Sequence, residues 1–93
     1  MNDKTAEYVS EILKVIAHPV RLQIVEILER GEKSVGEITK QLGLQQAFTS
    51  GHLGIMKSKG VLSCRRQGAK VYYRIENQNV ILLLHCIYDH CEK

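Results

Sequence analysis

Apolar residues in the first third of the chain recur at intervals of three and four positions, which is the spacing of one face of an α-helix. This pattern predicts a first helix over residues 5–17. Pro19 ends that helix and begins a second one, because proline fits the first helical turn but not a helix interior. Gly31 is a suitable end for the second helix.

A second pair of helices is indicated by capping and turn residues. Ser34, followed three residues later by Glu37, has the pattern of a capping box, which predicts that a short helix begins there. Gly43 ends this helix, and another helical segment follows over about 45–58. A short helix, a tight glycine turn and a second helix have the spacing of a helix-turn-helix, which we assign to about residues 34–58.

Two β-prone runs follow the helix-turn-helix. Residues 61–66 and 70–75 are separated by a loop that contains Gly68, and this arrangement predicts a two-stranded hairpin over about 61–75. The hairpin carries several Lys and Arg residues, so it forms a basic projection, or wing.

The last predicted helix covers about residues 78–91, with Asn77 or Asn79 as its cap. Its segment 80–84 reads Val-Ile-Leu-Leu-Leu, which is apolar on every side of a helix. A small monomer covers only one side of such a helix. We therefore expect this helix to pack against its copy in a homodimer, with the first helix widening the contact.

The composition is that of one small globular domain. The chain has 93 residues, of which 44% are hydrophobic and 25% charged. With the predicted elements, the expected fold class is mainly α with a small β-hairpin: a single winged helix-turn-helix domain of about five helices over residues 1–93. No apolar run approaches the ~18 residues of a membrane span and the polar N-terminus is no signal peptide, so a cytoplasmic protein without a membrane partner is expected. Its three cysteines would be reduced there.

Charge is distributed unevenly along the chain. Residues 38–75 contain no Asp or Glu but hold seven of the thirteen Lys and Arg residues. Such a segment favours a polyanion partner, since each phosphate that Lys or Arg neutralises releases condensed counterions. A solvated face that happens to lack acidic residues is the alternative interpretation.

Several stretches, taken in order, resemble a known family. They are residues 13–24, LKVIAHPVRLQI; residues 34–38, SVGEI; residues 42–53, which begin LGLQQA and end HL; residues 60–62, GVL; and residues 68–75, GAKVYYRI. On these stretches the chain resembles the ArsR family of metal- and thiol-responsive repressors. The resemblance spans nearly the whole chain. It implies a dimeric winged-helix repressor that leaves its operator when an inducer binds or modifies it.

The helix over 45–58 departs from the family pattern in two places. Gln45 stands where the family commonly has Ser, which is a better helix cap, and Gly51 stands where it has a larger polar or basic residue. Glycine costs about 1 kcal/mol in a helix interior, and Gly54 adds a second weak point. We therefore expect a recognition helix that is pliable until it binds DNA, and an operator sequence unlike those of relatives.

As a working hypothesis, the start of this recognition helix enters the major groove of double-stranded DNA. The polar candidates for contacts with bases or phosphates are Gln45, Gln46, Thr49, Ser50 and His52. The basic candidates for contacts with phosphates or, from the wing, with the adjacent minor groove are Lys57, Lys59, Arg65, Arg66 and Lys70. His52 could equally be a packed structural histidine, and Phe48 is expected in the core.

The end of the last helix concentrates metal-binding and thiol groups, which are His85, Cys86, Asp89, His90 and Cys91. Thiolate and imidazole suit zinc, another soft metal ion or a metalloid such as trivalent arsenic, so a metal inducer is one interpretation. A thiol redox or persulfide switch is the second, and a regulator without a small-molecule inducer is the third. Cys86 and Cys91 form the sensing pair under either sensing interpretation, within one chain or across the dimer. Cys64 is a further thiol, for which a structural role is favoured.

Other functions compete with DNA-bound regulation. An enzyme is disfavoured because the sequence has no nucleophile with a base at a suitable spacing and no glycine-rich phosphate loop. A winged-helix module that serves only protein assembly is the stronger rival, although the acid-free segment argues against it. RNA binding is less favoured because the basic segment lacks aromatic stacking platforms.

Overall fold

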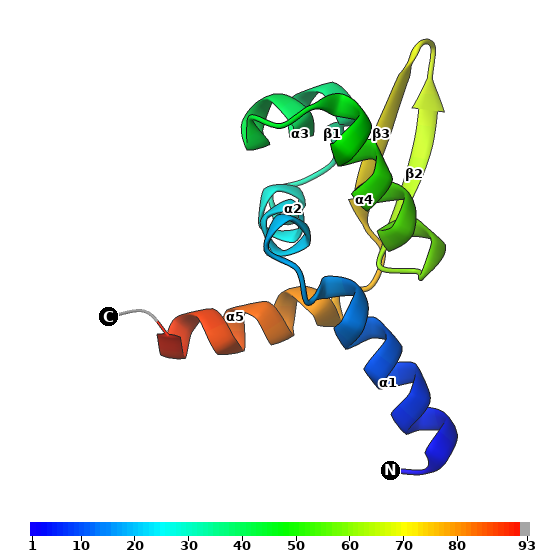
Figure 1. Ribbon diagram of the computed structural model, residues 1–93, viewed down its shortest axis with the longest axis vertical. Coiled ribbons are helices and arrows are strands. Elements are labelled where there is room, and N and C mark those ends of the chain that lie inside the picture. Colours follow the sequence, from blue (N-terminus) through cyan, green and yellow to red (C-terminus); the bar gives the residue numbers. More distant parts are fainter. Residues whose placement is uncertain (92–93) are drawn as a thin grey trace.

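A computed structural model describes the backbone of residues 1–91 and the side chains of residues 1–89. Over these residues the chain forms five helices and a small antiparallel sheet (Figure 1). Their order is α1 Asp3–Ile16, α2 Pro19–Glu29, β1 Lys33–Ser34, α3 Val35–Leu42, α4 Gln46–Ser58, β2 Leu62–Gln67, β3 Lys70–Ile75 and α5 Asn79–Cys91. The predicted winged helix-turn-helix is confirmed, with α3 and α4 as its helix pair and the β2–β3 hairpin as its wing.

Local sequence signals account for several of the helix ends. The Ser34 hydroxyl accepts a hydrogen bond from the Glu37 backbone N–H at 3.1 Å, and the Glu37 carboxylate accepts one from the Ser34 N–H at 2.8 Å. This reciprocal pair is the predicted capping box. Gly43 ends α3 in the left-handed conformation, with a φ of 70° that other residues rarely adopt. Gln45 precedes α4 without a side-chain capping hydrogen bond, as expected for a poor cap.

The sheet has three strands in the part of the chain that the structure describes: the predicted two-stranded wing and one further strand, β1, that was not predicted. Its order is β1-β3-β2 and all pairs are antiparallel, because the short strand β1 pairs with the far side of β3. β2 and β3 pair over their whole length, from Leu62 opposite Ile75 to Gln67 opposite Lys70. The turn between them begins at Gly68, whose φ of 63° suits the tight hairpin turn.

One apolar core joins the helices to the sheet. Ile24 and Val25 of α2 and Leu53 and Met56 of α4 are fully buried in it. Its other members are Val15, Ile16, Leu28, Ile38, Val61, Leu62, Ile75 and Val80. Since α4 packs on α2 and on β2, the body of the protein sets the position of α4.

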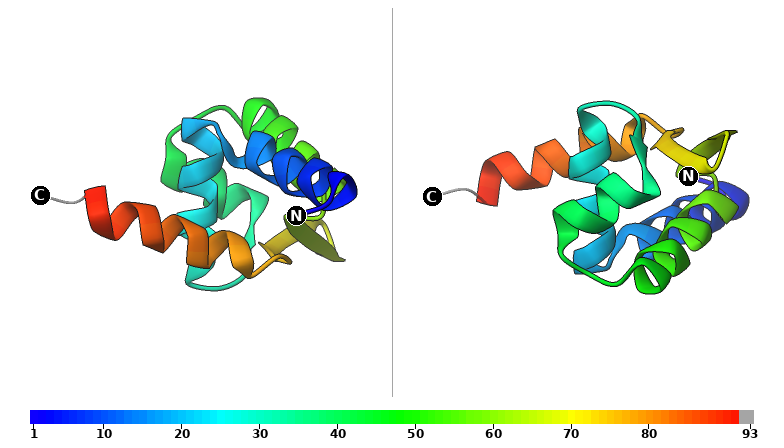
Figure 2. Two further views of the ribbon diagram at one scale, coloured as in Figure 1. Left: turned by 90° about the horizontal axis from the view of Figure 1, so that it is seen from below. Right: turned by 90° about the horizontal axis from the view of Figure 1, so that it is seen from above.

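α1 and α5 extend away from this core. Figure 1 shows the C-terminal end of α1 and the N-terminal end of α5 near the same corner of the body. From there the two helices diverge, and in Figure 2 they extend to opposite sides. Both leave apolar side chains exposed, which are Tyr8, Val9 and Leu13 on α1 and Leu82, Leu83, Ile87 and Tyr88 on α5. Within the described residues, no helix combines the length and apolar character that crossing a membrane requires.

Candidate nucleic-acid interface

A groove of about 590 Å³ lies where α3, α4 and the wing meet. Gln46 and Ser50, both exposed on the first turns of α4, line it together with Lys40 of α3 and Lys70 of β3. Glu37 also lines the groove, but its carboxylate is held in the capping box, whose hydrogen bonds lower its pKa. The groove therefore presents polar side chains and two lysines at the start of α4.

The two faces of α4 differ from those predicted. Thr49 is fully buried and its hydroxyl donates a hydrogen bond to the Gln45 carbonyl at 3.1 Å, so it faces the core. Phe48 was expected in the core but is 50% exposed. Gly51 and Gly54 lie on the exposed side, where an added Cβ atom would meet nothing within 4 Å. Thr49 is therefore removed from the candidates for base contacts.

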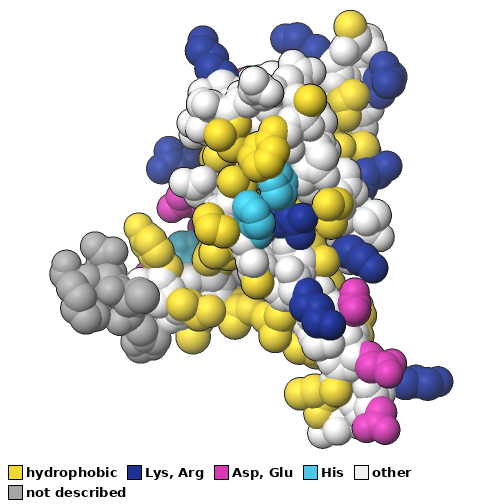
Figure 3. All heavy atoms as spheres, in the orientation of Figure 1, with side chains coloured by type: hydrophobic (Ala, Val, Ile, Leu, Met, Phe, Trp, Pro, Cys, Tyr) yellow, Lys and Arg dark blue, Asp and Glu magenta, His cyan; other side chains and the backbone are white. Residues whose placement is uncertain are grey.

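His52 is packed inside the protein. Its side chain is only 8% exposed, and its Nδ1 accepts a hydrogen bond from Nε of Arg21 at 3.0 Å. The rings of His18 and Phe48 lie on it, with centroids 4.6 and 4.7 Å away. Burial, and then the charges of His18 and Arg21, lower the pKa of His52. Figure 3 shows histidine atoms (cyan) at the surface of the body, between apolar and basic side chains. Of the two interpretations of His52, the structural one agrees with these contacts.

Arg65 is engaged within the protein. Its Nε and Nη2 donate to the two carboxylate oxygens of Glu32 at 2.8 and 2.7 Å, and its Nη1 donates to Gln67 at 2.6 Å. The guanidinium carbon also lies 4.7 Å from the centroid of the Tyr72 ring. The ion pair raises the pKa of Arg65 and lowers that of Glu32. Arg65 therefore fixes the wing against the loop before β1, and we no longer assign it to a DNA phosphate.

The other basic residues of the acid-free segment fall into two groups. Lys59 pairs with Glu11 at 3.4 Å, and Arg74 pairs with Glu76 at 3.6 Å. Among the described residues, the basic residues of this segment that have no ion-pair partner are Lys40, Lys57, Arg66 and Lys70. The sequence-based contacts omitted Lys40, although its place in the acid-free segment was a signal for it.

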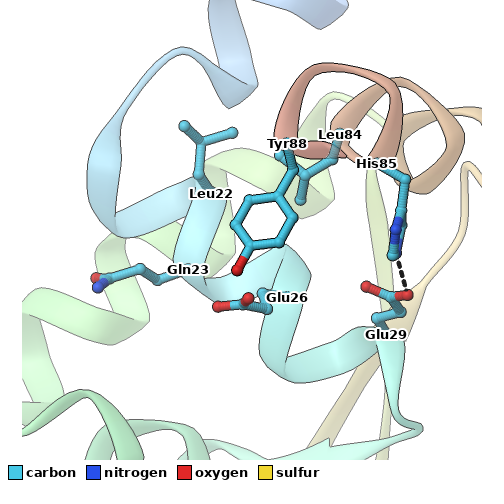
Figure 4. A pocket seen from close by; sticks show the side chains of 7 residues that line it. All are labelled: Leu22, Gln23, Glu26, Glu29, Leu84, His85 and Tyr88. Carbon is cyan, nitrogen blue, oxygen red and sulfur yellow. Dashed lines mark hydrogen bonds and ion pairs between the residues drawn. The ribbon is translucent and has the colours of Figure 1, made fainter. Parts of the chain in front are cut away.

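α5 is attached to α2 by a histidine–carboxylate contact (Figure 4). Nε2 of His85 lies against the Glu29 carboxylate, which raises the pKa of His85, and Asp89 adds a smaller effect in the same direction. Beside this contact, a groove of about 240 Å³ runs between the helices. In Figure 4 the Tyr88 ring projects across it toward Glu26 of α2. His85 is thus already bound within the chain.

The described side chains of α5 do not gather into a metal site. Among residues 1–89, no three His, Cys, Asp or Glu side chains lie close enough together to hold an ion. Cys86 is exposed, whereas the side chains of His90 and Cys91 lie outside the described residues, so the predicted Cys86–Cys91 pair is not placed. Cys64 is partly buried in β2 opposite Tyr73, and burial followed by the nearby thiol raises the pKa of Tyr73.

Comparison with known proteins identifies the family. Residues 18–63 match the family model described as bacterial regulatory protein, arsR family, and they include the whole helix-turn-helix. A biofilm growth-associated repressor of Xylella fastidiosa is 36% identical over 86 residues, which cover 92% of this chain and 75% of that relative. The chain belongs to the ArsR family. Since ArsR proteins are transcription regulators, family membership excludes the enzyme alternative.

Solved structures share the fold over almost the whole chain. HlyU from Vibrio cholerae N16961 aligns with a TM-score of 0.88 and 32% identity, covering 94% of this chain and 98% of that chain. The homodimeric winged helix-turn-helix DNA-binding domain Mb0332 from Mycobacterium bovis aligns with a TM-score of 0.84 and 30% identity, covering 99% of this chain and 88% of that chain. Because coverage is nearly complete, the projecting helices α1 and α5 are part of the shared ArsR fold.

Proposed function

We propose that this ArsR-family protein is a sequence-specific repressor that binds double-stranded DNA as a homodimer in the cytoplasm. The observation that carries the proposal is the groove at the start of α4, where Gln46 and Ser50 are exposed beside Lys40 and Lys70. Polar side chains of this kind contact base edges, and lysines neutralise phosphates. The Xylella relative is named a repressor and the Mycobacterium neighbour a DNA-binding domain, which supports the same function.

In this proposal α4 is the recognition helix. Its first turns, with Gln45, Gln46 and Ser50, enter the major groove of DNA. Lys57 near the end of α4 and Arg66 on the wing contact phosphates, since both are exposed and neither has an ion-pair partner among the described residues.

The apolar faces of α1 and α5 are the proposed dimer interface. Leu82 and Ile87 on α5 are 68% and 57% exposed, and Tyr8 on α1 is 61% exposed. Burial of such side chains against a second copy is favourable by about 25 cal/mol per Å² of apolar surface. Because the Mycobacterium neighbour is described as homodimeric, the same arrangement is supported here. A two-fold dimer would bind an operator with two inverted half-sites.

We further propose that the signal that releases the protein from DNA acts on the thiols of α5. The Cys86 thiol is exposed, so a persulfide donor or another thiol-reactive species can reach it. A soft metal ion fits the described residues of one chain less well, because His85 is bound to Glu29 and no three donor groups converge. We therefore favour a reactive-sulfur or redox signal at Cys86, with Cys91 as its partner thiol.

Selection of DNA from a random library tests the proposed function. The purified protein is mixed with random duplexes of about 30 base pairs, and the affinity for the recovered sequences is measured at several salt concentrations. We expect inverted half-sites and a slope of log K against log salt of about −0.9 for each phosphate contacted. Replacing both groove lysines (Lys40→Ala, Lys70→Ala) should weaken binding to all duplexes and flatten the slope, whereas Lys4→Ala with Lys14→Ala on α1 should not. A module for protein assembly would retain no duplex even at low salt, which would contradict DNA binding.

The signal is tested on the recovered duplex with reduced protein, with added Zn²⁺ or arsenite, and with a persulfide donor. We expect only the persulfide donor to lower the affinity. Cys86→Ser should remove this response, while Cys64→Ser, as the matched control, should keep it. An affinity that no treatment changes would indicate a regulator without a small-molecule inducer.

A further inference from the structure

One arginine connects three helices of the protein. Arg21 lies in α2, and its Nη1 donates a hydrogen bond to the Val15 carbonyl in α1 at 3.0 Å. Its Nε donates to Nδ1 of His52 in α4 at 3.0 Å. The position of α4 therefore depends on a side chain that lies outside the helix-turn-helix in the sequence.

His52 is held by contacts on several sides. The residue is 8% exposed, and its ring centroid lies 4.6 Å from that of His18 and 4.7 Å from that of Phe48. His18 is itself fixed, because its Nδ1 accepts a hydrogen bond from the Val20 N–H at 3.1 Å as the cap of α2. Since Nδ1 of His52 accepts from Arg21, the ring proton must be on Nε2 and the ring must be neutral.

We propose that the Arg21–His52 hydrogen bond positions the recognition helix for DNA, and that a proton on His52 breaks it, so that acid weakens DNA binding. This inference rests on the DNA-binding function proposed above. Arg21 and His52 act as positioning residues, because neither lines the groove at the start of α4.

The surroundings of His52 oppose its protonation. Burial lowers its pKa, and so do the two charged or titratable neighbours that act on it, His18 and Arg21. In the described part of the chain, α1, α3 and β2 also pack against α4, but no carboxylate from them acts on this ring. A proton on Nδ1 would remove the acceptor for Arg21 and place two cations 3.0 Å apart. The tie between α4 and the α1–α2 junction would then be lost.

The expected pH dependence of DNA affinity has the opposite sign to the usual one for DNA-binding proteins. Histidines that gain charge in acid ordinarily strengthen binding to phosphates. If DNA binding requires neutral His52, the affinity is constant well above the pKa of His52 and falls as pH drops through that pKa. The limit of this fall is about tenfold per pH unit. The sign of the pH dependence therefore separates the proposed link from a general effect of charge.

The experiment compares pH profiles of affinity for the duplex recovered at about pH 7.5. Wild-type affinity should stay constant from about pH 7.5 down to the lowered pKa of His52, and should then fall, by up to about tenfold per pH unit, as the pH drops below that pKa. In His52→Asn the amide oxygen replaces Nδ1 as the acceptor and takes no proton, so the affinity near neutral pH should stay within about threefold and the fall should disappear. His18→Asn, which keeps a capping oxygen for α2, is the matched control: it should retain the fall in acid, with its midpoint moved to higher pH because the charge of His18 lowers the pKa of His52. Wild-type affinity that rises in acid, or a fall that persists in His52→Asn, would overturn the inference.

A second measurement needs no DNA and uses the wild-type full chain. Nitrogen-15 NMR of the imidazoles should show His52 protonated on Nε2 at neutral pH, with a titration that also moves the amide signals of α4. A proton on Nδ1 at neutral pH, or a titration that leaves α4 unchanged, would overturn the Arg21–His52 link. If the ring behaves as expected but no duplex is recovered at neutral pH, the proposed function is contradicted, and with it the effect on DNA.

Discussion

The end of the molecule formed by α3, α4 and the wing differs from the end formed by α1 and α5 in what each exposes. Figure 3 shows basic side chains spread around the upper body, while apolar atoms line the lower edge, along α5 and up to its junction with α1. Ile38 of α3 and Leu53 of α4 are fully buried, whereas Leu82 and Ile87 of α5 are 68% and 57% exposed.

A single chain therefore buries the apolar side chains at the α3–α4–wing end of the molecule, but not those at the α1–α5 end. α3, α4 and the sheet bury most of their apolar side chains against α2 and present lysines and polar groups to solvent. α1 and α5 have no equivalent cover within the described chain, which is why we assign their apolar faces to a second copy. Under this assignment the fold of the monomer determines how one half-site is bound, and the dimer determines the distance between two half-sites.

The largest expected effect is on the free energy of unfolding, at the buried face of α4. Leu53→Ala should lower the free energy of unfolding by about 2–5 kcal/mol, because it removes a fully buried side chain and leaves a cavity under α4. Ile55→Ala, at a position of the same helix that is 44% exposed, is the matched control and should change it by about 0.5 kcal/mol or less. Urea unfolding followed by circular dichroism measures both. Equal losses would show that the core does not hold α4 as described.

A smaller effect, on the stability of the dimer, is expected at the exposed apolar faces of α1 and α5. Ile87→Glu should raise the dimer dissociation constant at least about thirtyfold, or about 2 kcal/mol, because it places a charge within the proposed apolar interface. Sedimentation equilibrium measures the change. Ile55→Glu, which adds the same charge on α4, should leave the dimer intact. A dimer that tolerates Ile87→Glu would place the interface on another face.

The capping box gives a prediction for stability and its pH dependence. Ser34→Ala should cost about 1 kcal/mol at neutral pH, because it leaves the Glu37 N–H without its partner. The pKa of Glu37 is lowered from 4.5, mainly by hydrogen bonds from Ser34. The Glu37 carboxylate therefore stabilises the folded protein fully above pH 4.5, and this stabilisation is lost as pH falls through the lowered pKa. Urea unfolding at several acidic pH values should show a weaker acid dependence in Ser34→Ala than in wild type. Identical slopes would contradict the reciprocal contact.

The smallest effect separates two neighbouring arginines of the wing. Arg66→Ala should lower affinity for the selected duplex about threefold and reduce the salt slope by about 0.9, because it removes one phosphate contact. Arg65→Ala should change the salt slope less, since its charge is already offset by Glu32. Fluorescence anisotropy at several salt concentrations distinguishes the two. A larger slope change in Arg65→Ala would return that residue to the interface.

Features that depend on neighbours in the sequence could be predicted from it. The capping box at Ser34 and the left-handed turn at Gly43 depend on residues within a few positions, so the helix-turn-helix was found. The faces of α4 could not be predicted, because its polar residues Thr49 and His52 are buried while Phe48 is exposed. Thr49 satisfies its hydroxyl within its own helix, but His52 relies on a partner that is 31 positions away.

Long-range partners also explain what was missed on the wing. The sequence predicts Arg65 to be a free, exposed charge, because its partner Glu32 is 33 positions away and gives no local signal of the contact. β1 has only two residues, too few for an alternating pattern, so its pairing with β3 left no signal in the sequence.

The thiols of α5 are a different case. The side chain of Cys91 lies outside the described residues, so the predicted sensing pair of Cys86 and Cys91 stays a prediction.

That short strand has a consequence for the shape of DNA that this protein would accept. β1 leads directly into α3, the partner of α4 in the helix-turn-helix, and pairs with β3, so backbone hydrogen bonds couple the helix-turn-helix to the wing. A hairpin on a loose tether could follow a duplex of any local curvature, but a coupled one keeps a constant separation from α4. Sites would then be selected for groove width and stiffness as well as for their bases, including at positions that no side chain touches.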